Sequence, residues 1–262
     1  MNDKPLSGKR ALVTGASGAL GSAIASRLAA DGASLLLHGH SRPDALQALA
    51  DKIRAAGGQA DCCVFDIADD NATAAAVAQM LQAGPLQIIV NNAGIHDDAV
   101  FPGMKPVQWH RVIDVSLHGF FHVTQPLLLP MARSRWGRIV NVISTSVREP
   151  IPNLGVSNTI RGAVAGWAKP LSRELAADGI TVNSVLPGYT ETARLAQILC
   201  DRAHASGQSE AAVAAAMRQT VPAGRFAQPA EVAAAIAFLC APAAAYINGV
   251  SLAVDGGRMQ SI

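Results

Sequence analysis

The residues best suited to chemistry begin with a glycine-rich segment at positions 14–21, which reads T-G-A-S-G-A-L-G. The segment follows a short apolar run, Ala11–Thr14, and leads directly into a stretch with helical periodicity. A strand-to-helix turn of this kind presents backbone N–H groups at a helix N-terminus, where they bind a pyrophosphate. The turn therefore predicts a dinucleotide site. The residues expected to form it are Gly15, Ser17, Gly18, Leu20 and Gly21.

Short apolar runs that alternate with helical segments must position this turn. The runs, each expected to be a strand, are Ala11–Thr14, Ser34–His38, Asp61–Phe65, Ile88–Asn91, Arg138–Ile143, Thr181–Leu186 and Ser251–Val254. Near-continuous apolar runs are typical of parallel strands buried on both faces. We therefore predict an α/β fold of the Rossmann type, in which a doubly wound, seven-stranded parallel sheet is flanked by helices. Residues 1–262 are expected to form a single domain, with a small lid at about 190–222.

Composition and charge restrict the classes of partner. Half of the 262 residues are hydrophobic and the net charge is only +2, which argues against disorder and against attraction to nucleic acid or acidic membranes. The four cysteines show neither zinc-type nor disulfide spacing, so we expect no metal site. The first ten residues are polar and the longest apolar stretch is interrupted by Pro242, so no signal peptide or membrane span is expected. We therefore expect a cytoplasmic protein.

The glycine-rich segment and three later motifs together resemble the short-chain dehydrogenase/reductase family. The later motifs are N-N-A-G at residues 91–94, P-G-x-x-x-T at 187–192 and D-G-G at 255–257. The resemblance covers essentially the whole chain. It implies a nicotinamide cofactor and usually a tetramer, built through helices near residues 105–134 and 156–178.

The resemblance also implies which further residues hold the cofactor. Asp66 and Ile67 are expected beside the adenine, and the segment Asn92, Ala93 and Gly94 beside the inner ribose. The other residues expected to bind cofactor are Pro187, Gly188, Thr192 and Arg161. One departure from the family is Ala19, which stands at the middle glycine position. Its methyl group is expected to weaken pyrophosphate binding unless Gly18 lets the loop shift.

The end of the second predicted strand bears on the choice of cofactor. An NAD-selective site places a carboxylate there to bind the ribose 2′-OH. In this chain the position falls in H-G-H-S-R at residues 38–42, which contains no carboxylate. Because His40, Ser41 and Arg42 are suited to a 2′-phosphate, we predict NADP(H) rather than NAD(H).

Three of the four catalytic positions implied by the resemblance are changed. The family uses an asparagine, a serine, and the tyrosine and lysine of Y-x-x-x-K; the aligned residues here are Ser116, Ser144, Ser157 and Arg161. A serine hydroxyl lacks the acidity of a phenol, and losing a general acid costs about 10²–10⁴ in rate. Arg161 keeps a positive charge with a different geometry. The resulting S-N-x-x-R motif predicts low activity in ordinary ketone reduction.

Titratable residues close to the predicted site are candidates to replace the missing tyrosine as the general acid. His96, Asp97 and Asp98 follow the N-A-G turn, and a histidine beside Ser144 is able to act near neutral pH. We favour the interpretation that this stretch is a solvated charged loop. The predicted helix that carries Ser157 also contains Pro170, for which a local bend is the minimal interpretation.

Two principal functions remain open. The first is an NADP(H)-dependent reductase acting on a small molecule or a 3-oxoacyl thioester, as in reductases of the fatty-acid or polyketide type. Arg133 and Arg135 are candidates for docking an acyl carrier protein, whereas Asp178 has the wrong sign for an acidic partner. The second is a catalytically silent subunit that binds cofactor and works in a hetero-oligomer. A less favoured third is redirected chemistry, such as a lyase or isomerase.

Overall fold

The strands form one parallel sheet in the order β3-β2-β1-β4-β5-β6-β7, which confirms the predicted doubly wound fold. The structure is a computed structural model that describes residues 4–261. The strand bounds are β1 Arg10–Val13, β2 Ser34–Gly39, β3 Gln59–Val64, β4 Ile88–Asn91, β5 Gly137–Val142, β6 Ile180–Pro187 and β7 Ser251–Val254. Every predicted strand is therefore present, and no end differs from the prediction by more than two residues.

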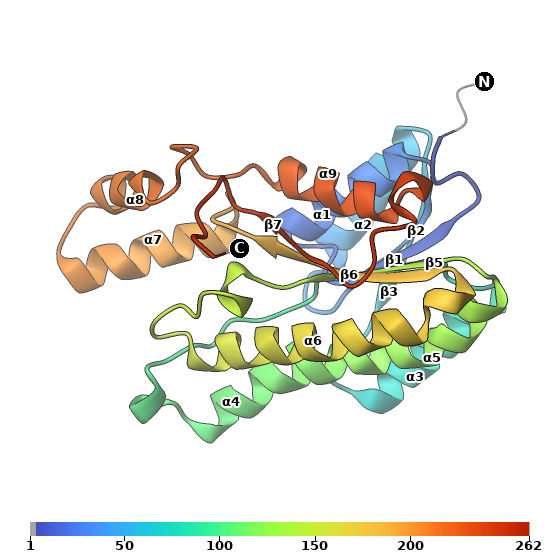
Figure 1. The fold of residues 1–262 in the computed structure, drawn as a ribbon, viewed down its shortest axis with the longest axis horizontal. Helices are drawn as coiled ribbons and strands as arrows, with labels where there is room; N and C mark the ends of the chain where they lie inside the picture. Colours follow the sequence, from blue (N-terminus) through green and yellow to red (C-terminus); the bar gives the residue numbers. More distant parts are fainter. Residues whose placement is uncertain (1–3, 262) are drawn as a thin grey trace.

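Helices cover both faces of the sheet (Figure 1). One layer consists of α1, α2 and α9, and the opposite layer of α3, α4, α5 and α6 (Figure 1). The long helices are α1 Ala19–Ala30, α2 Pro43–Ala55, α3 Asp70–Gln82, α4 Pro106–Ile113, α5 Gly119–Arg133, α6 Gly155–Glu174, α7 Ala193–Ser206, α8 Glu210–Gln219 and α9 Pro229–Cys240. The short turns are η1 Phe101–Gly103, the π turn η2 Asp114–His118, η3 Thr145–Val147, η4 Ala176–Asp178 and η5 Pro242–Ala244.

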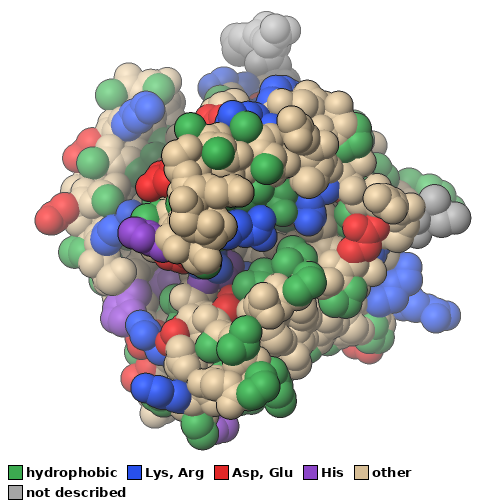
Figure 2. All heavy atoms as spheres, turned by 90° about the vertical axis from the view of Figure 1, so that its left-hand side faces the viewer, with side chains coloured by type: hydrophobic (Ala, Val, Ile, Leu, Met, Phe, Trp, Pro, Cys, Tyr) green, Lys and Arg blue, Asp and Glu red, His purple; other side chains and the backbone are tan. Residues whose placement is uncertain are grey.

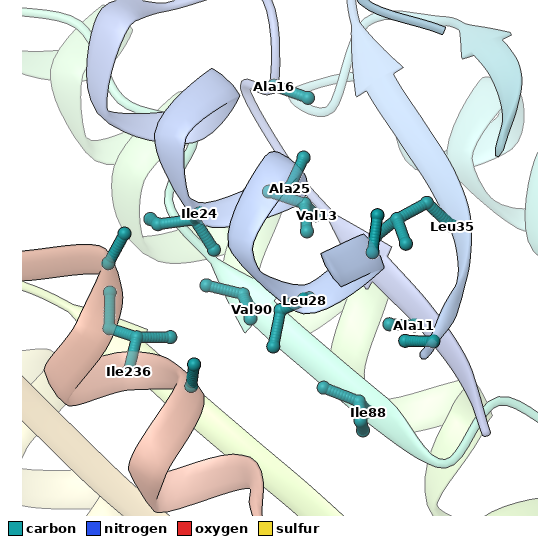
Figure 3. Close-up of a cluster of buried hydrophobic side chains, with 14 of the residues drawn as sticks. Ala11, Val13, Ala16, Ile24, Ala25, Leu28, Leu35, Ile88, Val90 and Ile236 are labelled. Carbon is teal, nitrogen blue, oxygen red and sulfur yellow. The ribbon is translucent and has the colours of Figure 1, made fainter. Parts of the chain in front are cut away.

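Buried aliphatic side chains fix these layers to the sheet. Figure 3 shows Ile24 and Leu28 of α1 beside Val90 of β4, with Ile236 of α9 closing the same cluster. These side chains are fully buried, and burying each aliphatic side chain contributes roughly 1.5–3 kcal/mol. A second cluster joins α3, α5 and α6 to the other face. The sheet is therefore a rigid base for the loops that follow its strands.

The strand order reverses between β1 and β4, because β1 pairs with β2 on one side and with β4 on the other. In open α/β sheets ligands bind outside the carboxyl ends of the strands at such a reversal. The helices α7 and α8 project at this end (Figure 1). They share a small apolar cluster of their own, which includes Leu195, Val213 and Phe226. The segment predicted as a lid thus contains two helices.

The helix α6 and the membrane-spanning potential of the helices were both subjects of prediction from the sequence. The helix α6 is continuous from Gly155 to Glu174 and includes Pro170, whose missing N–H removes one bond to the preceding turn. The helix nevertheless continues for a further turn. Among residues 4–261, no helix combines the length and apolar character needed to cross a bilayer.

Candidate functional site

Backbone geometry shapes the glycine-rich loop between β1 and α1. Gly15 has φ +65°, a conformation that L side chains rarely adopt. A Cβ at Gly21 would collide with the carbonyl oxygen of Gly15 and lie 2.8 Å from Nδ2 of Asn92. Thr14 Oγ1 accepts hydrogen bonds from the N–H groups of Asn92 and Ala93, at 2.9 and 3.0 Å. The loop is thus tightly joined to the segment that follows β4.

A buried histidine also holds this loop. His38 lies at the end of β2 with only 2% of its surface exposed. Its Nδ1 accepts the N–H of Gly15 at 3.3 Å, and its Nε2 donates to the carbonyl oxygen of Phe65 at 3.1 Å. Burial lowers the pKa of His38 to about 4. The ring is therefore neutral at pH 7, with the proton on Nε2, and this tautomer satisfies both partners.

The residues proposed to select the cofactor lie next to this loop. The guanidinium Nη2 of Arg42 is 3.9 Å from the position that a Cβ on Gly18 would occupy. His40 Nδ1 lies 3.9 Å from Asp66 Oδ2, so these two residues share one edge of the cleft. Ala19 is exposed at the first position of α1 and lines the cleft, as do Gly18 and Arg42. The Arg42 guanidinium beside this turn is suited to binding phosphate groups.

The four aligned catalytic positions lie on three parts of the chain. Ser144 follows β5 and caps η3, and its Oγ accepts the N–H of Ser146 at 3.1 Å. Ser157 and Arg161 are one turn apart on α6 and are both buried. Ser116 lies in the π turn between α4 and α5 and is fully buried. Distortions of this kind in helices are frequent at functional sites.

Arg161 is inserted beneath the loop that follows β4. Its Nη1 donates to the carbonyl oxygen of Val142 at 3.4 Å. A Cβ on Gly94 would lie 3.4 Å from both Arg161 Nη2 and Ser116 Oγ, so the guanidinium and the hydroxyl border the same spot. Burial lowers the pKa of Arg161 to about 10, an effect opposed by the charge of Asp98. The group therefore remains a cation at neutral pH, as predicted.

The loop after β4 corrects one expectation. Asp98 was expected on a solvated charged loop, but only 5% of its side chain is exposed. Its Oδ2 accepts the hydroxyl of Ser157 at 2.6 Å, and its Oδ1 accepts the backbone N–H of Ser157 at 3.2 Å. Arg194 Nη2 lies 3.9 Å from the same carboxylate. The interpretation was wrong for Asp98 because a tertiary contact with α6, which the local sequence does not show, removes it from water.

The neighbouring residues of this loop have different surroundings. Asp97 Oδ1 accepts a hydrogen bond from Gln108 Nε2 at 2.7 Å, which ties the loop to α4. His96 lines the cleft and is exposed to it. Desolvation by the cleft walls, followed by the charges of Arg194 and Arg161, lowers the pKa of His96. His96 is therefore a neutral imidazole at pH 7, which makes it a poor substitute for an acid.

Asn158, the second residue of the S-N-x-x-R motif, has a structural role. Asn158 Nδ2 donates to the carbonyl oxygen of Ile151 at 2.8 Å, and Asn158 Oδ1 accepts the N–H of Ile151 at 3.3 Å. The asparagine thereby clamps the loop between η3 and α6 with a pair of hydrogen bonds. Ile151 and Leu154 of that loop line the cleft. Each of the three polar residues of the motif thus has a different partner. Ser157 donates to Asp98, Asn158 bonds to the loop that lines the cleft, and Arg161 donates to the last residue of β5.

One cleft of about 1080 Å³ brings the predicted residues together. Every residue proposed for cofactor binding or catalysis lines it except Ser116, which lies behind Gly94. We call the part after β1, β2 and β3 the β1–β3 half. The part after β4, β5 and β6, together with the cleft residues after β7, is called the β4–β6 half. Figure 2 views the molecule from this end and shows Lys, Arg and His side chains gathered around a hollow.

Residues that the sequence analysis missed also line the β4–β6 half. Arg194 begins α7, and Arg258 follows β7. The Arg258 guanidinium stacks on the ring of Tyr189, with Cζ 4.5 Å from the ring centroid. Its Nη1 donates to Thr145 Oγ1 at 3.4 Å. The available signal was the position of each arginine directly after a motif, two residues beyond Thr192 and one beyond the D-G-G segment.

The comparisons with known proteins agree with this geometry. Residues 15–258 match the family model described as "Enoyl-(Acyl carrier protein) reductase". The 3-oxoacyl-[acyl-carrier-protein] reductase FabG of Vibrio harveyi is 36% identical over 254 residues, covering 96% of this chain and 98% of that protein. The short-chain reductase protein NovJ of Streptomyces niveus is 34% identical over 251 residues, covering 95% of this chain and 93% of that protein.

Solved structures are similar over nearly the whole chain. The actinorhodin polyketide ketoreductase, solved as a variant with NADPH, superposes with a TM-score of 0.92 at 32% identity, covering 97% of this chain and 98% of that one. YwfH, an NADPH-dependent reductase of bacilysin biosynthesis, superposes with a TM-score of 0.91 at 26% identity, covering 97% and 99%.

Proposed function

The chain belongs to the short-chain dehydrogenase/reductase family, and on that premise we propose that it binds NADP(H) and reduces a carbonyl group with low activity. NADPH supplies the hydride for such a reduction, and the products are an alcohol and NADP⁺ once a proton is added. Relatives named as 3-oxoacyl reductases make a small 3-oxoacyl compound or thioester the first substrate class to test. The observation that carries the proposal is the single cleft shared by the glycine loop, Ser144 and Arg161.

The residues present fit the cofactor. The left-handed conformation of Gly15 and the close packing at Gly21 are backbone features that a side chain would destroy. Arg42 lies beside the loop, where it is suited to a 2′-phosphate, and the strand end around it lacks an acidic side chain that would repel one. Arg161 keeps a buried positive charge next to Gly94, where the family lysine would bind ribose. Structural neighbours described with NADPH support this choice.

The weak element of the proposed mechanism is proton donation. Ser144 Oγ accepts the N–H of Ser146 at 3.1 Å, and among residues 4–261 its hydroxyl hydrogen has no acceptor, so it is able to hold a carbonyl oxygen. Ser157 instead gives its hydrogen to Asp98. Since a serine hydroxyl is a poor acid and His96 is neutral at pH 7, the proton must come from solvent or from a water held near Ser144. Slow turnover is the expected result.

A second function is favoured by a separate observation. Apolar side chains are exposed on two surfaces, with Phe121 and Leu129 on α5 and with Tyr246 and Leu252 near β7. Exposed apolar patches of this kind are typical of protein–protein interfaces. They support a homotetramer and are equally suited to an active relative in a hetero-oligomer, where this chain would be a silent cofactor-binding subunit. Docking of an acyl carrier protein gains less support, because Arg135 is paired with Asp178 at 2.7 Å.

Cofactor binding and turnover distinguish the two functions. NADPH and NADH are titrated first, and a tighter NADPH complex that weakens in Arg42→Gln supports the cofactor assignment. NADPH oxidation is then followed with 3-oxobutanoyl and longer 3-oxoacyl thioesters, in the wild type and in a Ser157→Tyr/Arg161→Lys variant.

We expect wild-type turnover to be about 10²–10⁴ below that of an enzyme with the acid restored. Binding of NADPH with no turnover by the wild type of any 3-oxoacyl thioester or of the corresponding free 3-oxo acids supports the silent subunit. Tighter binding of NADH than of NADPH contradicts the cofactor proposal.

A further inference from the structure

The β4–β6 half carries more arginine residues than the one, Arg161, that we assign to cofactor binding there. Besides Arg161, the walls carry Arg194 at the start of α7 and Arg258 after β7. Of the carboxylates nearby, Asp98 is taken up by two hydrogen bonds from Ser157, and Asp114 lies 3.1 Å from His118. An excess of cations in a partly closed cleft attracts anions and stabilises them once bound.

Arg258 is held in place without a carboxylate partner. Within residues 4–261, no Asp or Glu lies at ion-pair distance from its guanidinium. Its contacts are the face of Tyr189, at 4.5 Å, and the hydroxyl of Thr145, at 3.4 Å. Glu149 is close enough for the charge of Arg258 to contribute to its lowered pKa, but the larger causes are the N–H groups of Ser261 and Gln260, which it accepts at 2.8 and 2.7 Å. Stacking fixes the plane of a guanidinium and leaves its edge N–H groups available to an anion.

The two contacts of Arg258 place it on the same side of the cleft as Ser144. Thr145 directly follows Ser144 after β5, and Tyr189 follows β6, the neighbouring strand. We expect an anion bonded to Arg258 to lie near the carbonyl that Ser144 would hold. The phosphate of a carrier-protein arm does not meet this requirement, because the whole pantetheine chain separates it from the thioester carbonyl. A carboxylate one or two carbons from the carbonyl does meet it.

Arg194 adds a second positive charge from the start of α7. It lies 3.9 Å from Asp98, a distance longer than a good hydrogen bond, so its donors are not used up by that carboxylate. It also stands in the first turn of α7, where the helix dipole is positive. The lowered pKa of His96, caused first by desolvation and then by Arg194 and Arg161, reflects the same concentration of positive charge.

We propose that the β4–β6 half is built for an oxo acid with a free carboxylate, bound by Arg258 with help from Arg194, rather than for a thioester. The proposal rests on the proposed carbonyl site and names its substrate class. Arginine and carboxylate form charge-assisted, often bidentate hydrogen bonds, which are among the strongest that a binding site offers. A thioester or ester offers no negative charge there and would leave the Arg258 guanidinium without an anionic partner.

The test compares matched ligands on the protein saturated with NADP⁺. Calorimetric titrations use 3-oxobutanoate, its methyl ester and its neutral N-acetylcysteamine thioester, with 3-oxohexanoate and its ester as a longer pair. We expect each acid to bind at least tenfold tighter than its ester. The preference should fall below threefold in Arg258→Gln, fall partly in Arg194→Gln and be partly restored in Arg258→Lys. Arg202→Gln, an exposed arginine of the same helix α7 outside the cleft, should keep the full preference.

Several results would overturn the proposal. Equal binding of acid and ester, tighter binding of the neutral thioester, or no saturable binding of either acid each exclude a carboxylate site. The same holds if Arg258→Gln keeps the acid preference, or if it weakens NADP⁺ binding as much as acid binding, because the arginine then serves the cofactor. If the wild type binds no NADP(H), the proposed function fails separately. The acid and ester are then compared on the protein alone.

Discussion

The β1–β3 half and the β4–β6 half of the cleft hold their residues in different ways. In the first, backbone sterics dominate, and a methyl group at Gly21 would collide with Gly15. In the second, replaced side chains satisfy one another, as Ser157 does with Asp98 and Asn158 with Ile151. The β4–β6 half is therefore a network of exchanged hydrogen bonds, in which the side chain of residue 157 points towards Asp98.

The difference predicts how each half responds to substitution. Adding a side-chain atom where backbone segments are in close contact, as in the β1–β3 half, should cause a large loss of stability and of cofactor binding. Removing one hydrogen-bonding side chain from the β4–β6 half should cause a smaller loss of stability, limited to the bonds of that side chain.

The largest effect is expected from Gly21→Ala in the β1–β3 half. The added Cβ would overlap the Gly15 carbonyl and lie 2.8 Å from Asn92 Nδ2, so the loop must move. Overpacking of this kind typically costs about 1–3 kcal/mol, and we expect about 3 kcal/mol in the free energy of unfolding because backbone is involved. NADPH binding should fall at least a hundredfold. Urea unfolding and fluorescence titration measure the two quantities.

Gly162→Ala is the matched control. Gly162 lies on α6, where a Cβ would meet no atom within 4 Å. Alanine in a helix interior is about 0.5–1 kcal/mol more favourable than glycine, so this variant should be slightly more stable than the wild type. If Gly21→Ala is as stable and binds as well as Gly162→Ala, the backbone account of the β1–β3 half is wrong.

Acid should weaken the same half through His38. Its pKa is about 4 in the folded protein, against about 6.5 in an unfolded chain. Below pH 6.5 the unfolded state binds a proton that the folded state excludes, so stability falls as the pH decreases towards 4. Between pH 7 and pH 4.5 this group alone should remove about 2–3 kcal/mol.

His38→Asn isolates that contribution. The variant cannot titrate at this position, so its stability at pH 7 should be lower and its loss between pH 7 and pH 4.5 smaller, by about 2 kcal/mol. Urea unfolding at both pH values gives the difference. An identical pH dependence in both proteins would show that His38 carries no burial penalty.

In the β4–β6 half, Asp98→Asn should have a moderate effect. The amide keeps the size of the side chain but removes the charge near Arg161 and Arg194 and one acceptor of Ser157. Leaving a buried polar group without its partner costs about 1–3 kcal/mol, which should appear in the free energy of unfolding. Asp97→Asn, where Gln108 is the partner, should cost less than about 1 kcal/mol. Equal losses in the two variants contradict the buried role of Asp98.

The fold was predictable from the sequence because it depends on local patterns. Apolar runs such as Ile88–Asn91 mark strands buried on both faces, and the glycines of residues 15–21 mark a turn that few side chains permit. The order of the strands follows from right-handed crossovers between parallel neighbours. These signals operate over a few residues and survive without knowledge of the tertiary structure.

The network of the β4–β6 half could not be predicted in the same way. Asp98 and Ser157 are 59 positions apart in the chain, and only the packing of α6 beside the loop after β4 brings them together. Arg258 and Thr145 are 113 positions apart. Contacts between side chains of separate loops leave no periodic pattern in a sequence. Asp98, on a loop that reads as solvated, therefore has a buried side chain that the sequence did not predict.

The smallest effect, and the most local, is expected from Asn158→Ala. The change removes a pair of hydrogen bonds to Ile151 but leaves Ser157 and Asp98 untouched. Because the Ile151 loop lies at the surface of the cleft and its backbone groups regain water, the cost should be about 1 kcal/mol. Hydrogen exchange at the Ile151 amide should nevertheless accelerate about tenfold. Thr159→Ala, which removes only an exposed bond to the Gly155 carbonyl, should leave that amide unchanged. If the amides of Asp98 and Ser157 also exchange faster in Asn158→Ala, the contacts of Ser157 and Asn158 are coupled. The view that the two residues make independent contacts would then be wrong.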